Sequence, residues 1–369
     1  MSTAELRGPD AGRAHEGYRG LRRFGSLDGL RFLCIGAVLW HHSPLFNAGE
    51  FSARILHRGF TGVDFFFVLS GFLITTLLLR EAEARGRFSL SGFYRRRALR
   101  ILPVYYLLVT AIGAYYIWGK GAAEYLGYMP FYYLFLANFL QGDVPLLSPT
   151  WSLSVEEQYY LLWPLLLMLL PRRWLLGVLG LGALLCTAAL GGAFDPLGIR
   201  GFDLGLLRIN MPPYSAILIG SALAVTLHDP RGFALLWRVL GHRAAPLGTF
   251  ALLLVLWQVL PGDLSGWPFL VMHLAMAACL ASIVLREDHL LAPVLTFPPL
   301  ARIGMVSYGI YLYHLSAMHF AHMIGGNRMW LVMLAYLALS WLIAEISYRF
   351  YERHFLAWAH RPTGGRRTP

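Results

Sequence analysis

Long apolar runs, separated by short arginine-rich segments, constrain most strongly what this chain can fold into. The runs over 161–170, 175–190 and 329–342 carry no charged side chain. A helix needs about 20 mainly apolar residues to cross a bilayer, and lipid leaves no water to satisfy an irregular backbone. Of the 369 residues, 14% are charged and 57% are hydrophobic, whereas a soluble domain averages about 25% charged residues. We therefore expect an all-α fold, a polytopic membrane helix bundle.

About ten transmembrane helices are predicted. They are expected near residues 28–45, 60–79, 98–118, 151–170, 174–192, 211–227, 246–261, 268–285, 302–324 and 329–351. The apolar segment 128–140 is excluded, because a helix of this length covers roughly 20 Å of a hydrocarbon core of about 30 Å. We expect it to be a re-entrant or surface-lying helix.

The arginine clusters support this arrangement. If 128–140 does not cross and the N-terminus is cytoplasmic, the clusters over 80–97, 231–243 and 349–367 all lie on the cytoplasmic side. This is the positive-inside bias of membrane proteins. If 128–140 crossed, every later cluster would face outward. Both termini are therefore expected to be cytoplasmic.

The ends of the chain are predicted to be tails. Residues 1–25 are expected to form a disordered cytoplasmic tail, 26–355 the transmembrane domain and 356–369 a second cytoplasmic tail. The first apolar run lacks a small-residue cleavage site, which indicates a retained span and not a signal peptide. No appended soluble domain is evident.

Charge and cysteine content exclude two classes of partner. The net charge of +11 would suit nucleic acid, but the arginines follow the membrane topology, so no nucleic-acid partner is expected. Cys34, Cys186 and Cys279 lie inside apolar runs without disulfide or metal-ligand spacing. They are expected to be buried apolar residues, and no metal is expected.

The first predicted span carries Arg31 and, eleven positions later, His42. At about 100° per residue the two return to within roughly 20° of one helix face, roughly 16 Å apart along the axis. Ionisable groups inside a bilayer are costly and often functional. The alternative is that Arg31 extends to lipid phosphate while the histidines only end the span.

The next two spans add charged residues at both boundaries. Asp64 is placed near the outer boundary, where it would either join a site or cap and pair locally. Gly71 is expected to permit close helix packing. Arg97 and Arg100 share a face at i,i+3 and could grip phosphate at the cytoplasmic side, or serve only as topology signals.

Later spans carry further polar residues. Glu156 and Glu157 cannot both point to one face, and Ser152 or Ser154 as helix N-cap would explain only one of them. His314 lies near mid-membrane, where an imidazole needs a partner, whereas His273 is interpreted as a structural residue. Glu345 and Arg349 are expected to pair with each other at i,i+4.

These stretches resemble the acyltransferase-3 family of multi-span bacterial acyltransferases. The matching segments are 27–42, 62–74, 97–103, 151–160, 307–314 and 348–352. The family's Arg-ten-His pair falls on Arg31 and His42, its Arg-x-x-Arg on Arg97 and Arg100, and its glutamate on Glu156. The usual proline after the C-terminal glutamate is missing here, which leaves Glu352 without an assigned role.

The resemblance implies transfer of an acyl group from cytoplasmic acyl-CoA, with acetyl-CoA as the first choice, to a hydroxyl of a glycan or macrolide-type acceptor. It implies a multi-pass protein of the bacterial plasma membrane that acts alone or with separate partners; a homo-oligomer is left open. The expected catalytic residues are His42, Glu156 and Asp64, with Arg31, Arg97 and Arg100 binding the donor. Substrate binding is expected from Trp151, Ser154, Tyr308 and His314.

His42 is expected to act as general base, supported by a carboxylate such as Glu156, or as carrier of a transient acyl group. The rival class is a proton-coupled membrane transporter or exporter of a polar or acylated small molecule, in which histidine and glutamate relay protons.

Overall fold

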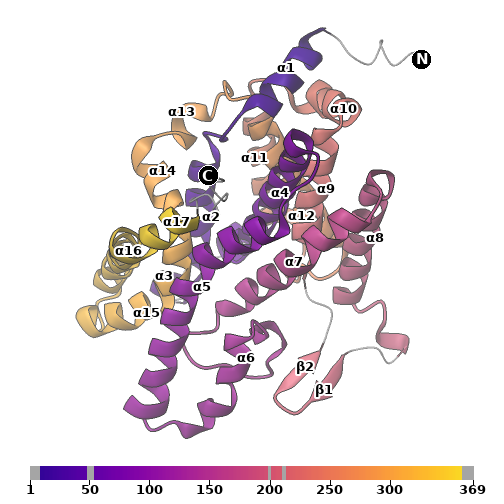
Figure 1. Cartoon of the computed structure of the whole chain (residues 1–369). Coiled ribbons are helices and arrows are strands. Elements are labelled where there is room, and N and C mark those ends of the chain that lie inside the picture. Colours follow the sequence, from indigo (N-terminus) through magenta and orange to yellow (C-terminus); the bar gives the residue numbers. More distant parts are fainter. Residues whose placement is uncertain (1–8, 48–53, 198–200, 210–212, 360–369) are drawn as a thin grey trace, which may run out of the picture. The chain divides into compact units, whose positions relative to one another are not determined.

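The computed structural model describes residues 9–47, 54–197, 201–209 and 213–359. Within them the chain is almost entirely helical (Figure 1), as the sequence predicts. The exception is a hairpin of β1 (Phe202–Leu204) and β2 (Leu207–Ile209), in which Phe202 pairs with Ile209.

The chain divides into two compact units. Unit 1 comprises Met1–Phe88 and Val155–Met305, and unit 2 comprises Ser89–Ser154 and Val306–Pro369. The helices of unit 1 are α1 (Pro9–Gly20), α2 (Leu27–His41), α3 (Pro44–Asn47), η1 (Arg54–Arg58), α4 (Thr61–Arg85), α8 (Arg172–Leu190), η5 (Asp195–Leu197), α9 (Ser215–His228), α10 (Pro230–Leu240), α11 (Ala245–Val259), α12 (Trp267–Val284), α13 (Ala292–Leu295) and α14 (Pro298–Met305). The helices of unit 2 are α5 (Leu90–Ala114), η2 (Tyr115–Gly119), η3 (Ala123–Gly127), α6 (Met129–Tyr133), η4 (Ala137–Phe139), α15 (Ser307–Gly325), α16 (Met329–Ser347), η6 (Tyr348–Glu352) and α17 (Arg353–Ala359). Helix α7 (Thr150–Leu169) begins in unit 2 and continues in unit 1.

Five helical segments in the described residues are long and apolar enough to cross a membrane. They are Thr61–Arg85, Leu90–Gly119, Arg172–Leu190, Trp267–Val284 and Met329–Ala359. Helices α10 and α11 bend by 77° at their junction and would together add a sixth. A membrane-helix protein is confirmed at this level. The count of ten spans and the cytoplasmic position of both termini stay predictions.

Helices α4 and α9 pack closely in unit 1 (Figure 1) because each presents a glycine to the other's backbone. A Cβ added at Gly71 would lie 2.0 Å from the carbonyl oxygen of Ile217, and one at Gly220 would lie 2.1 Å from that of Val68. Small residues at such crossings let helix backbones approach. The packing role expected for Gly71 is confirmed.

Next to this crossing, α7 contacts α4 and α9 through buried hydroxyl groups. Tyr159 and Ser221 lie 2.6 Å apart through their side-chain oxygens, and Ser221 accepts from Thr75 at 2.9 Å. The indole of Trp163 donates to Thr75 at 2.8 Å. Buried polar groups need such partners, so this network aligns the three helices.

The predicted disordered tail is in part wrong, because residues 9–20 form α1. His15 and Tyr18 on α1 pack against Phe233 of α10, with ring centroids 4.8 and 5.5 Å apart. Phe233 is fully buried. This aromatic contact gives a polar segment an apolar surface on which to fold. The hydropathy of the segment itself does not predict this helix.

In unit 2, the segment 128–140 is not one helix. Helix α6 ends after five residues, and Phe135 then takes a left-handed backbone with φ of 54°. Its ring stacks on Tyr105 with centroids 4.2 Å apart, and the hydroxyl of Tyr105 donates to the carbonyl of Tyr132 at 2.8 Å. These contacts turn the segment back on α5, so none of the described helices here is long enough to cross a membrane.

Candidate functional site

The opening helix α2 carries the first predicted pair. The guanidinium of Arg31 binds Asp28 one turn earlier, at 2.6 Å, and Asp28 also accepts from Arg23 at 2.8 Å. Both Arg31 and His42 are half-buried. Asp28 was not singled out from the sequence, although its i,i+3 spacing from Arg31 is the signal that would have found it.

His42 directly follows the last residue of α2. Its backbone amide still donates to the carbonyl of Val38 at 3.2 Å, and the same carbonyl lies 3.0 Å from the ring Nδ1. A carbonyl oxygen only accepts, so Nδ1 carries the hydrogen. The neutral ring therefore presents Nε2 as its basic nitrogen. This backbone carbonyl orients the ring, and the predicted support of His42 by a carboxylate such as Glu156 stays a prediction.

The start of α4 lies against the end of α2. A Cβ at Gly62 would lie 2.5 Å from the carbonyl oxygen of Cys34 and 3.1 Å from the side chain of Val38. A Cβ at Gly59 would meet the carbonyl of Ala37 and the side chain of His41. Asp64 follows in the first turn of α4, where the helix dipole stabilises a negative charge.

Asp64 points to a partner that sequence reasoning missed. Its Oδ1 lies 3.6 Å from Nε2 of His273 on α12, and both side chains are buried. The other ring nitrogen of His273 lies 3.0 Å from the hydroxyl of Ser215, the first residue of α9. In the sequence, His273 stands out only as an imidazole inside an apolar span, and this does not predict which residue it contacts.

Glu156 accepts a hydrogen bond of 2.6 Å from Ser70 on α4. Two residues on, Gln158 accepts from Tyr214 at 2.6 Å. Ser152 and Ser154 do not cap α7. They lie inside its first two turns, and their hydroxyls donate back to the carbonyls of Pro149 and Thr150 at 3.1 Å.

The arginine pair lies on α5 in unit 2. Arg97 is half-buried over the ring of Phe93, and Arg100 is exposed. The hydroxyl of Tyr308 on α15 donates to the carbonyl of Ile101 at 3.0 Å. This bond holds the Tyr308 hydroxyl at the residue that follows Arg100, and its role in substrate binding stays a prediction.

The remaining substrate-binding candidates are held in packing contacts of unit 2. His314 is fully buried and its Nδ1 donates to the carbonyl of Tyr311 at 2.6 Å. The hydroxyl of Tyr311 in turn lies 2.7 Å from that of Ser152. Ser154 accepts from the amide of Ala137 at 3.2 Å, and Trp151 is half-buried.

The described residues of unit 1 thus hold Arg31, His42, Asp64 and Glu156, and those of unit 2 hold the other six candidates. The family model of the acyltransferase domain, acyltransferase-3, matches residues 24–349.

The chain belongs to the acyltransferase-3 family.

Among curated relatives, the peptidoglycan O-acetyltransferase OatA of Listeria monocytogenes is 28% identical over 391 residues, covering 92% of this chain. The O-acetyltransferase OatA of Staphylococcus aureus is 28% identical over 363 residues, covering 88% of this chain. The chain spans 59% and 56% of the length of these two relatives. No solved structure matches it.

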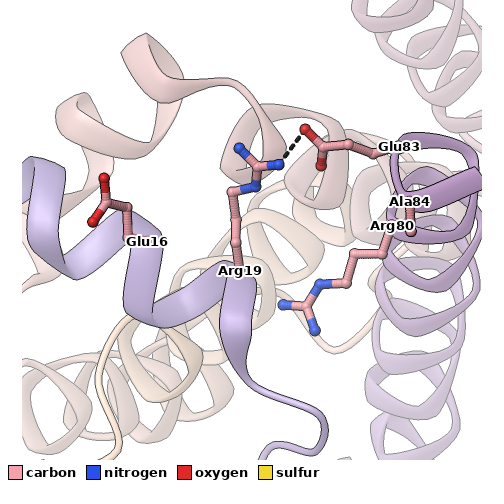
Figure 2. Close-up of a pocket in the computed structure, with 5 residues that line it drawn as sticks. All are labelled: Glu16, Arg19, Arg80, Glu83 and Ala84. Atoms are coloured by element: carbon pink, nitrogen blue, oxygen red, sulfur yellow. Dashed lines mark ion pairs between the residues drawn. The ribbon is translucent and has the colours of Figure 1, made fainter.

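This acyltransferase-3 protein has a pocket of about 450 Å³ beside the end of α4, shown in Figure 2. Arg19 and Glu83 form an ion pair across it. The guanidinium of Arg80 donates to the carbonyls of Leu21 and Tyr18 at 2.6 and 2.7 Å. Two glutamates and two arginines line the pocket, and both arginines are already bound to other groups of the protein. We therefore do not place an acyl donor in this pocket.

Next to this pocket, burial lowers the pKa of His15. That ring is therefore a packing group of α1, consistent with its contact with Phe233. Among the residues that the structure describes, no group of three or more histidines, cysteines or acids is arranged to hold a metal ion.

Proposed function

We propose that this protein is a membrane-bound O-acyltransferase that transfers an acyl group from cytoplasmic acyl-CoA to a hydroxyl of a glycan or macrolide-type acceptor. Family membership supports the reaction class. The printed names of the relatives, two O-acetyltransferases of which one acts on peptidoglycan, favour acetyl as the group and a glycan as the acceptor. Acetyl-CoA is then the donor, and the bacterial plasma membrane the location.

In this proposal His42 is the general base. Its Nε2 takes the proton of the acceptor hydroxyl while the acceptor oxygen bonds to the acyl carbon. The carbon–sulfur bond breaks, and the departing thiolate takes the proton from the imidazolium, so coenzyme A leaves as the thiol. Asp64 and Glu156 would stabilise the imidazolium in between. A path through an acyl-histidine uses the same nitrogen as nucleophile.

The observation that carries the proposal is the bond between Nδ1 of His42 and the Val38 carbonyl. A histidine at a helix C-terminus can make this bond to stabilise the helix end. A general base needs the bond in addition, because the wrong tautomer would present a hydrogen where the lone pair is needed.

Donor binding is proposed for Arg97 and Arg100, whose guanidinium groups suit the phosphates of coenzyme A. Arg31 keeps its proposed donor role, with one of its nitrogens already bound to Asp28. Trp151, Ser154, Tyr308 and His314 stay proposed substrate-binding residues.

The decisive experiment is an acyl-transfer assay on purified protein in detergent, with acetyl-CoA and a panel of glycan and macrolide acceptors. We expect the His42→Ala variant to lose about 10²- to 10⁴-fold in kcat/KM, the usual contribution of a positioned base. The neighbouring His41→Ala variant is the matched control and should lose little. Full activity of correctly inserted His42→Ala would refute the assignment. A wild-type protein that moves solutes in sealed vesicles but never consumes acetyl-CoA would be a transporter.

A further inference from the structure

Three buried side chains of unit 1 lie in a chain of contacts, and the reaction proposed above uses only one of them. They are Ser215 on α9, His273 on α12 and Asp64 on α4, with exposed fractions of 0%, 2% and 7%. Two of them come from outside the stretches that carried the family resemblance. The three helices on which they lie pack against one another.

The direction of each contact follows from the donors and acceptors. Nε2 of His273 faces the carboxylate of Asp64, which when ionised only accepts, so Nε2 carries a hydrogen. In the neutral ring Nδ1 then accepts from the hydroxyl of Ser215 at 3.0 Å. The Ser215 hydroxyl fits this tautomer as donor, and Phe269 stacks on the ring with centroids 5.3 Å apart.

The contact between His273 and Asp64 is open in this structure. At 3.6 Å it is longer than a hydrogen bond, and Nε2 is buried with no hydrogen-bond partner among the described residues. Catalytic hydrogen bonds are often long without substrate and shorten in the working complex. The His273 ring and the Asp64 carboxylate fit this pattern, because they face each other at slightly more than hydrogen-bond distance.

Stability alone is a poor reason for this arrangement. A buried ion pair is often no more stable than apolar residues of the same volume, because both groups lose their hydration. An acid and an imidazole aimed at each other in this setting are better explained by a function.

We propose that His273 is a positioning residue for the transfer reaction, acting through Asp64. His273 holds the Asp64 carboxylate in one orientation. The negative charge then stabilises the imidazolium of His42 after it takes the acceptor's proton. The start of α4 lies against Val38, whose carbonyl orients His42. This inference rests on the proposed function.

The test compares His273→Leu with His273→Gln, whose side-chain amide can still donate to Asp64. We expect His273→Leu to lower kcat by about 10- to 100-fold, less than the roughly 10²- to 10⁴-fold contribution of the proton-transfer group itself, with KM for acetyl-CoA unchanged. His273→Gln should recover a large part of kcat. Ser282→Ala is the matched control. It removes another buried hydroxyl, bonded to Cys279 and Thr249, where α12 meets α11, and should keep full kcat.

A double-mutant cycle separates positioning from packing. Asp64→Asn combined with His273→Leu should be no slower than the worse single variant, because both remove one function. Unchanged kcat in His273→Leu, or losses that simply multiply in the double variant, would overturn the inference. If His273→Leu does not fold, Ser215→Ala replaces it. That variant should lower kcat with unchanged KM, and full kcat there would also overturn the inference.

The parallel His42→Ala assay tells the two failures apart. An active His42→Ala protein refutes the proposed function itself. An inactive His42→Ala protein beside fully active His273 variants refutes only the role of His273.

Discussion

Charged side chains within the predicted spans have two kinds of partner, residues one turn away in the sequence and residues on another helix. Glu345 and Arg349 lie on one helix, and their predicted pairing is confirmed at 2.5 Å. Asp64 and His273 lie on helices far apart in sequence, and Glu156 is bonded by Ser70 from another helix. A local partner can be predicted from helix geometry. A distant one depends on which helices pack together.

At the residue scale, Arg97→Ala or Arg100→Ala should weaken donor binding. Each removes a charge-assisted hydrogen-bond donor, and hydrogen bonds to charged groups contribute about 1.5–3 kcal/mol. We expect KM for acetyl-CoA to rise by about tenfold or more, with kcat at saturating donor unchanged. Initial-rate kinetics over a donor series provide the measurement.

The control is Arg87→Ala, an exposed arginine in the same predicted inner segment. This variant removes the same charge, but Arg87 lies outside α5 and is not part of the i,i+3 pair. The KM for acetyl-CoA should therefore be unchanged. If all three variants behave alike, the α5 arginines act only as topology signals.

At the element scale, the crossing of α4 and α9 depends on glycine at two positions. Neither helix can move away freely, because Ser221 on α9 also donates to the carbonyl of Gly71 at 3.0 Å. The contact at Gly71 and Gly220 is with backbone, which cannot rotate aside as a side chain would.

We therefore expect Gly71→Ala or Gly220→Ala to reduce the stability of the protein by about 1–3 kcal/mol or more, the usual effect of overpacking a core. The midpoint of thermal unfolding in detergent and the yield of folded protein measure this. Gly177→Ala on α8 is the comparison, because a Cβ there meets nothing within 4 Å. That variant should be neutral or stabilised by about 0.5–1 kcal/mol.

At the scale of the whole molecule, each compact unit is assembled from two separate stretches of the chain. The N-terminal stretch of unit 1 packs with helices that follow it by more than 60 residues. The membrane topology, in contrast, follows from the order of spans and arginine clusters along the chain. The prediction of ten spans with both termini inside is therefore open to a direct chemical test.

Single exposed cysteines report the side of the membrane. Cys34, Cys186 and Cys279 are free and buried, as expected, so the wild-type background should be low. In intact cells, a membrane-impermeant maleimide should label Glu124→Cys and Asp203→Cys but not Arg87→Cys. Permeabilised cells should show labelling of all three.

Glu124 and Asp203 flank the segment 128–140 and two predicted spans, 151–170 and 174–192. If that segment does not cross, the two positions lie on the same side. Labelling of Glu124→Cys without Asp203→Cys in intact cells would mean that 128–140 crosses the membrane, and the later arginine clusters would then face outward.

The helical class, the apolar segments, the pairing of residues one turn apart and the family could all be predicted from the sequence. They follow from hydropathy, helical period or short motifs, which are properties of neighbouring residues. Three contacts could not be predicted in this way: His273 faces Asp64, Ser70 binds Glu156 and α1 folds on Phe233. The reason is physical, because each contact joins side chains that only the packing of separate helices brings within hydrogen-bonding or van der Waals distance.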